Sequence, residues 1–165
     1  MDISLYLMNY LQARLNSKAN FVDVYIADAL IAKQMEIIIR DNGKKIDEQN
    51  KIPESFLSLS NICTQASGEF KHLFHIKHTS IHMEWDLNDK KNYSLENIHS
   101  LLGMMILNFP KAKIVFTYLS KKGEYVFDSQ KIIAEFTQEE LLQKEVLNYM
   151  SQLLEEHLNK VRDNL

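Results

Sequence analysis

The sequence predicts an α+β fold built around a largely antiparallel sheet, and three observations lead to this class. Apolar residues repeat at helical spacing in four segments, and they alternate at strand spacing in three pairs of neighbouring segments. Strands that follow one another directly in a chain usually pair as antiparallel neighbours. The 165 residues are 45% hydrophobic and 25% charged, the composition of an ordinary globular domain.

The first third of the chain predicts one helix and two strands. The helix carries an apolar stripe with a spacing of four residues: Ile3, Leu7, Leu11 and Leu15. Asp2 is a suitable N-cap for it. Alternating segments at 22–26 and 35–39 predict two strands, and the second strand runs into a turn.

The middle of the chain predicts a short helix and a hairpin. Pro53 is well placed to begin a helix over 55–65, and Gly68 is expected to end it in the left-handed conformation. Segments 70–76 and 81–87 are expected to form a hairpin, because apolar and polar residues alternate over 81–87, which predicts one buried face.

The last third predicts a helix, a second hairpin and a long final helix. Ser94 is a suitable cap for the first of these helices. The hairpin joins 113–119 to 124–127 through a turn that contains glycine. Thr137 and Glu140 form a capping-box pattern, which predicts that the final helix begins there and carries its apolar residues from position 142 to position 161.

Composition argues against several classes of function. The formal charge is -3, from 19 basic and 22 acidic residues, whereas a non-specific nucleic-acid binder needs a basic excess. No apolar run approaches about 18 residues, so we expect neither nucleic acid nor a membrane as partner. The single cysteine, Cys63, fits a reducing cytoplasm, where we expect the protein to reside. Walker A, GxGxxG, GxSxG and HExxH motifs are absent from the sequence.

Four histidines lie close together in the sequence and could suggest a metal site: His72, His75, His78 and His82. On a helix the last three would share a face, but in the predicted hairpin His72 and His75 point to opposite sides. No aspartate or glutamate lies between them to complete a ligand set. We therefore expect no metal, and a metal-assisted enzyme built on these histidines is a rival hypothesis.

The segment Asp41-Asn42-Gly43 is the strongest candidate for a binding site. Locally it predicts only a turn. A helix, two strands and then D-N-G nevertheless resemble the opening of the GHKL ATPase superfamily, which includes gyrase, histidine kinases and mismatch-repair ATPases. The resemblance implies a two-layer, Bergerat-like sandwich with a mixed sheet, in which Asp41 would receive the adenine amino group and Gly43 would let backbone approach the ring.

The resemblance is closest to a small group of stand-alone bacterial histidine-kinase-like ATPases. Segment 2–11 is similar to that group's first helix, and Gly68-Glu69-Phe70 is similar to its Gly-Gly-Glu-Leu strand entry. Segments 94–98 and 117–129 and the final helix are similar to its carboxy-terminal extension. The resemblance thus implies an ATPase-like domain over 1–90 and a helix-hairpin-helix extension over 91–165, packed as one unit.

Departures from the family pattern affect the catalytic residues. In the family helix a glutamate activates water and the adjacent asparagine holds Mg²⁺, and this register places Gln12 and Ala13 there. Glutamine cannot take a proton from water, and a methyl group cannot bind a hard cation. Lys45 replaces the second glycine of the nucleotide-binding motif, where backbone should lie against the nucleotide.

The phosphate-binding segment departs even further from the family. Its two glycines correspond to Pro53 and Ser55, and only residues 46–52 remain of the long lid. Seven residues span at most about 25 Å, too little to close over a triphosphate. Proline also lacks an amide that could bind a phosphate.

The sequence thus predicts a pseudo-ATPase that has lost hydrolysis, has no cofactor, and acts as a protein-interaction or scaffold module. Its partner would be an unidentified protein or a second copy of the chain. Four residues of the final helix could bury in such a partner, although packing within the chain is the alternative: Tyr149, Met150, Leu154 and Leu158. The alternative function is a nucleotide or small-molecule sensor that binds at Asp41, Asn42 and Gly43 without turnover.

Overall fold

Six strands form one mixed sheet in the order β3-β4-β2-β1-β5-β6. The computed structural model describes residues 2–30, 34–44, 46, 52–65, 68–74, 78–86 and 95–162. β1 and β5 pair in parallel, and every other neighbouring pair is antiparallel. The predicted α+β class with a mixed, largely antiparallel sheet is confirmed. The strands are β1 (Phe21–Asp28), β2 (Gln34–Asp41), β3 (Glu69–Phe74), β4 (Thr79–Asp86), β5 (Lys113–Ser120) and β6 (Gly123–Asp128).

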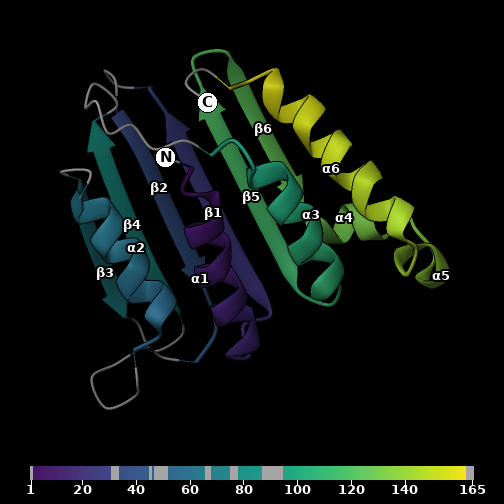
Figure 1. Ribbon diagram of the computed structural model, residues 1–165, viewed down its shortest axis with the longest axis horizontal. Coiled ribbons are helices and arrows are strands. Elements are labelled where there is room, and N and C mark those ends of the chain that lie inside the picture. Colours follow the sequence, from purple (N-terminus) through teal and green to yellow (C-terminus); the bar gives the residue numbers. More distant parts are fainter. Residues whose placement is uncertain are drawn as a thin grey trace.

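The longer helices form a second layer on one face of the sheet (Figure 1). α1 lies between α2 and α3, and α6 packs beside α3. The strands alternate between buried residues and half-buried or exposed ones, as expected for a sheet with one covered face. The helices are α1 (Ser4–Asn16), α2 (Glu54–Gln65), α3 (Ile98–Asn108), α4 (Ser129–Ile133), α5 (Gln138–Leu141) and α6 (Lys144–Asn159).

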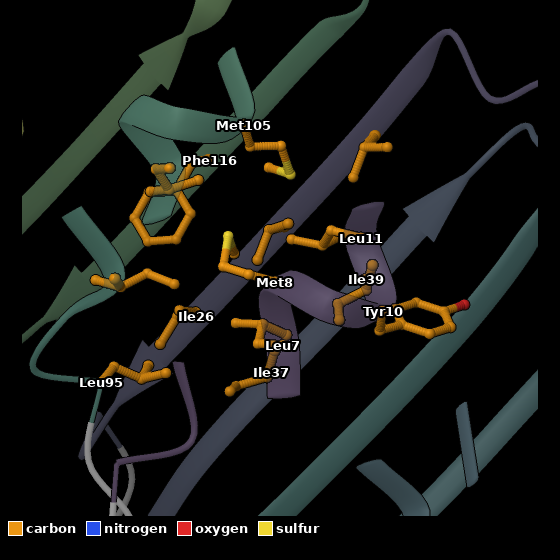
Figure 2. Packing of buried hydrophobic residues seen from close by; sticks show 14 of the residues in the cluster. Leu7, Met8, Tyr10, Leu11, Ile26, Ile37, Ile39, Leu95, Met105 and Phe116 are labelled. Atoms are coloured by element: carbon orange, nitrogen blue, oxygen red, sulfur yellow. The ribbon is translucent and has the colours of Figure 1, made fainter. Parts of the chain in front are cut away.

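The apolar stripe of α1 packs onto the central strands, as the sequence predicts. Leu7 and Leu11 are fully buried, together with Ile26 of β1 and Ile37 and Ile39 of β2 (Figure 2). Alternation in the strands places their apolar side chains on the face that the helix covers. This contact holds the end of α1 against the end of β2, where the D-N-G segment lies.

The final helix begins later than predicted. The capping box is present, because Thr137 Oγ1 accepts the Glu140 amide and the Glu140 carboxylate accepts the Thr137 amide, but it opens only the short helix α5. Gln143 is extended, and α6 begins after it. Leu142 is therefore 87% exposed rather than part of an apolar stripe. The apolar spacing continues across this break, so it could not reveal where one helix ends.

Two expected caps are also wrong in detail. Gly68 is not in the left-handed region, where Gly123 alone among the described glycines is found. It is needed for close packing instead, since a Cβ there would lie 2.6 Å from the Glu84 carbonyl oxygen. Ile3, not Asp2, is the N-cap of α1, although the Asp2 carboxylate still accepts the Ser4 amide at 2.9 Å.

The segment after residue 90 continues the same sheet and the same helical layer. β5 pairs along the whole length of β1, and β6 pairs with β5. The boundary between 1–90 and 91–165 stays a prediction. Ser94 and the hairpin residues 75, 76 and 87 lie outside the described residues. In the part of the chain that is described, no helix has the length and apolar character needed to cross a membrane.

Candidate functional site

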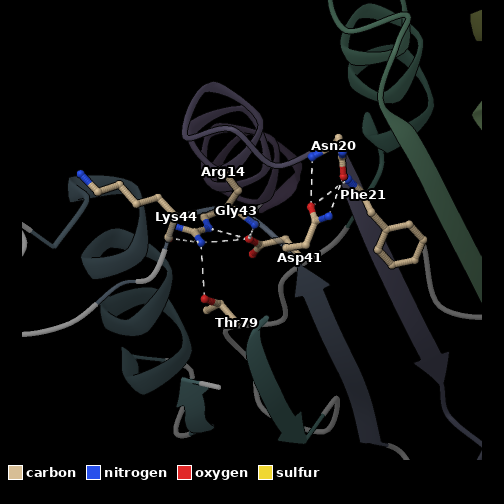
Figure 3. Close-up of polar contacts among 8 residues, drawn as sticks. Arg14, Asn20, Phe21, Asp41, Gly43, Lys44 and Thr79 are labelled. Carbon is tan, nitrogen blue, oxygen red and sulfur yellow. Dashed lines mark hydrogen bonds and ion pairs between the residues drawn. The ribbon is translucent and has the colours of Figure 1, made fainter. Parts of the chain in front are cut away.

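Asp41 lies at the end of β2, against the last turn of α1, and is only 1% exposed. Arg14 of α1, also 1% exposed, donates from Nε to Asp41 Oδ1 at 2.9 Å (Figure 3). Arg14 Nη2 donates to the Lys44 carbonyl oxygen at 2.6 Å and to Thr79 Oγ1 at 3.4 Å. The guanidinium therefore ties α1 to β2, β4 and the turn after β2, and it occupies one oxygen of the aspartate.

The turn after Asp41 fastens β2 to the connection between α1 and β1. Asn42 Oδ1 accepts the amides of Asn20 and Phe21, each at 3.0 Å (Figure 3). The Lys44 amide donates to the Ser17 carbonyl oxygen at 2.8 Å. Backbone groups at a helix end and at a strand start need such partners. The D-N-G segment is thus a turn, as its residue types predict. Its structural role is to hold the end of β2 against the connection between α1 and β1.

Gly43 lies where two parts of the chain approach closely. Its amide donates to Asp41 Oδ1 at 2.9 Å. A Cβ at this position would lie 3.1 Å from the Ala19 Cβ and 3.1 Å from the Arg14 carbonyl oxygen. The space beside the glycine is therefore taken by the chain itself.

Burial and the neighbouring polar groups have opposite effects on the pKa of Asp41. Burial raises the pKa of Asp41, while the Arg14 charge and the Gly43 amide act in the opposite direction. Burial also raises the pKa of Tyr10, and the negative charge of Asp41 adds to this effect. Asp41 Oδ2 and the Tyr10 hydroxyl are buried and have no hydrogen-bond partner among the described residues. Of the two carboxylate oxygens of Asp41, Oδ1 therefore accepts hydrogen bonds within the fold, whereas Oδ2 has no partner among the described residues.

Gln12, which the resemblance places at the position of the family's base, lies apart from this cluster. Gln12 is exposed and lines a hollow between α1 and α3, together with Met8, Met104 and Phe109. Ala13 is half-buried. The structure therefore brings Asp41, Asn42 and Gly43 together with Arg14, but it does not bring Gln12 into this group.

Pro53 and Ser55 lie at the start of α2. The Pro53 carbonyl oxygen accepts the Phe56 amide at 3.1 Å, so proline is part of the first helical turn. Ser55 Oγ is buried without a hydrogen-bond partner in the described part of the chain. Lys45 and residues 47–51 of the shortened lid lie outside the described residues.

Arg14 is the residue of this cluster that sequence reasoning missed. The sequence does indicate that Arg14 is buried. It follows Tyr10 by four residues and Leu11 by three, so it lies on the same face of the helix as the apolar stripe. A charged side chain on a buried stripe needs a buried partner of opposite charge. Asp41, already a candidate for its own reasons, is that partner.

The histidines do not gather into one described cluster. The side chain of His72 and all of His75 lie outside the described part, and His78 is half-buried beside the start of β4. His82 lies in β4 and approaches Glu36 and Glu84. The carboxylates near His82 come from β2 and from beyond the histidine segment, where the sequence analysis did not look for them.

Comparison with known proteins identifies the fold. The N-terminal domain of a DNA repair protein matches with a TM-score of 0.52 at 12% identity, over 76% of this chain and 51% of that chain. The MutL ATPase domain of Aquifex aeolicus, complexed with ADP, matches with a TM-score of 0.51 at 15% identity, over 88% of this chain and 68% of that chain. No family model and no curated protein matches the sequence.

The chain therefore has a GHKL-like fold, a two-layer arrangement with a mixed sheet covered by helices. It spans about half the length of the DNA repair domain. At such low identity the likeness concerns the fold alone, and function has to be argued from the residues of this chain.

Proposed function

We propose that the protein is a non-catalytic, GHKL-type pseudo-ATPase that acts as a protein-interaction or scaffold module. The observation that carries this proposal is the buried ion pair between Arg14 and Asp41. In the family that the sequence resembles, the corresponding aspartate receives adenine. Here the same carboxylate is used to hold α1 against the sheet.

A nucleotide would have to compete with this internal arrangement. Asp41 is 1% exposed, and the glycine beside it packs against the end of α1. Separating Arg14 from Asp41 would leave two buried charges without compensation, which costs several kcal/mol. Adenine binding would therefore have to overcome a large penalty before any favourable contact is made.

Hydrolysis would need further groups that the sequence lacks. Gln12 and Ala13 replace the base and the Mg²⁺ ligand, and proline and serine replace the phosphate-binding glycines. Removing a single group that stabilises developing charge commonly costs about 10² to 10³ in rate. Loss of several such groups supports loss of ATPase activity.

Fewer residues of α6 are available for an interaction surface than the sequence predicted. Met150, Leu154 and Leu158 are buried within the chain itself, where α6 packs against α3. Tyr149 is 52% exposed and contacts Phe136 edge-on. Of the four residues proposed for an interface, only Tyr149 is still exposed, and a protein partner or a second copy of the chain remains the proposed occupant of such a surface.

A sensor that binds without turnover is the second candidate, and one observation favours it. Asp41 Oδ2 and the Tyr10 hydroxyl are buried polar atoms without partners among the described residues. Such atoms usually meet a water molecule or a ligand. A small polar ligand could use them only if the segment around Asp41 opened.

Restoring the family residues on α1 is expected to leave the protein inactive. The variant Gln12→Glu/Ala13→Asn should hydrolyse ATP no faster than wild type, because a base and a metal ligand act only on a triphosphate that is already held in place. Residue 12 also lines the hollow toward α3 rather than the Asp41 cluster. Phosphate release with and without Mg²⁺, compared with heat-inactivated protein, measures this directly. Mg²⁺-dependent hydrolysis by either wild type or variant would show that the catalytic parts are present after all.

A further inference from the structure

Three side chains with metal-binding atoms meet on the face of the sheet opposite the helices. Glu36 of β2 lies directly across from Glu84 of β4, and His82 is two residues before Glu84 on the same face. His82 Nε2 is 3.5 Å from Glu36 Oε2 and 3.8 Å from Glu84 Oε2. One ligand atom from each residue lies within 4.8 Å of the others.

The strand register gathers negative charge at this point. Glu84 is flanked by Glu36 on β2 and by Glu69 on β3, so three carboxylates follow one another across three adjacent strands. Like charges directly opposite each other destabilise a sheet. Lys71 Nζ lies 3.3 Å from the Glu69 carboxylate and offsets that charge. Between Glu36 and Glu84 lies the imidazole of His82, which approaches both carboxylates.

The distances between the ligand atoms of these three side chains suit a small ion with tetrahedral coordination. Ligands placed about 2.0 to 2.1 Å from Zn²⁺ at tetrahedral angles lie about 3.3 to 3.4 Å from one another. The two distances from His82 Nε2 are close to this value. His82 Nε2 is also shielded from solvent and has no hydrogen-bond partner in the described part of the chain, so no hydrogen bond competes with its use as a ligand atom.

We propose that Glu36, His82 and Glu84 form a binding site for a divalent transition-metal ion of the Zn²⁺ class. One imidazole and two carboxylates are suitable ligands for this class, whereas Mg²⁺ and Ca²⁺ need six or more oxygen ligands. The three side chains are half-buried, so a fourth position remains open to water or to a carboxylate or imidazole of another molecule. The ion would neutralise the two glutamates and clamp β2 to β4.

This site is independent of the Asp41 cluster. It lies on the face of the sheet opposite the helical layer, whereas Arg14 reaches Asp41 from that layer. Metal binding and loss of ATPase activity can therefore be tested separately. A metal-free protein in which the His82 side chain lies beside the two glutamates without an ion is the competing arrangement.

Calorimetric titration of the EDTA-treated, dialysed protein with ZnCl₂ tests the proposal. We expect one equivalent to bind to wild type, and Mg²⁺ not to compete. His82→Gln and Glu84→Gln should each weaken binding by about a hundredfold or more, because even losses outside the ligand set commonly cost about 10- to 100-fold. Glu36→Gln should weaken it as well. The melting temperature of wild type, but not of these variants, should rise with Zn²⁺.

A matched control is available on the helical side. His99 Nε2 lies 3.8 Å from Glu155 Oε2, so this pair has one imidazole but only one carboxylate. His99→Gln should leave Zn²⁺ binding unchanged. Absence of Zn²⁺ binding by wild type, or binding that survives both His82→Gln and Glu84→Gln, would overturn the proposal, and the second result would point to other histidines or to Cys63. Circular dichroism of each variant checks that its fold is retained.

Discussion

Asp41→Ala is expected to lower the free energy of unfolding by about 3 to 5 kcal/mol. The substitution leaves the Arg14 guanidinium buried without its counter-charge, and it also removes the acceptor of the Gly43 amide. An uncompensated buried charge is among the most destabilising changes that a single substitution makes. Urea denaturation followed by circular dichroism measures this effect.

The double variant Arg14→Met/Asp41→Ala separates the ion pair from other losses at the site. Methionine keeps much of the apolar stem of Arg14 without a charge, so the double variant should be more stable than Asp41→Ala alone. Asp23→Ala is the matched control, because Asp23 pairs with Arg40 at 2.7 Å on the exposed face and should cost at most about 1 kcal/mol. If Asp41→Ala cost no more than Asp23→Ala, the buried pair would not hold α1 to the sheet.

Leu11→Ala should destabilise the protein by about 2 to 5 kcal/mol. Leu11 is fully buried on the side of α1 that packs against the central strands (Figure 2). Its truncation therefore leaves a cavity that the rigid sheet fills poorly. Leu5→Ala on the same helix is the control, because Leu5 is 57% exposed and should change stability by no more than about 0.5 kcal/mol. Equal unfolding midpoints for the two variants would contradict the placement of α1.

Much of the fold could be predicted from the sequence because alternation and helical spacing report directly on buried faces. Val24 and Ile26 alternate with half-buried residues in β1, and Leu7 and Leu11 mark the covered face of α1. The parallel pairing of β1 with β5 could not be predicted, since it joins segments more than 80 residues apart. Local spacing contains no information on such a pairing.

The break before α6 and the role of Gly68 escaped prediction for a different reason. Gln143 turns the chain out of the helix although the apolar spacing continues, and Gly68 is required by the neighbouring β4 backbone rather than by its own conformation. Both depend on the tertiary structure, which local patterns do not record.

The candidate site was predictable only in part. The D-N-G segment was found from residue types and from the family resemblance, but the use of Asp41 depends on Arg14, which lies 27 residues earlier in the chain. Likewise, the carboxylates near His82 come together only through the register of β2 with β4. Sites that combine side chains from several elements become visible when pairing and register are known.

Calorimetric titration of the wild-type protein with ATP and with ADP, in the presence of Mg²⁺, tests the central claim most directly. Because Arg14 holds the buried Asp41 carboxylate, we expect no saturable binding below millimolar nucleotide concentration, and the same result for Asp41→Asn. Micromolar binding to wild type that is lost in Asp41→Asn, with the variant still folded, would show that Asp41 receives a nucleotide and would contradict the pseudo-ATPase account.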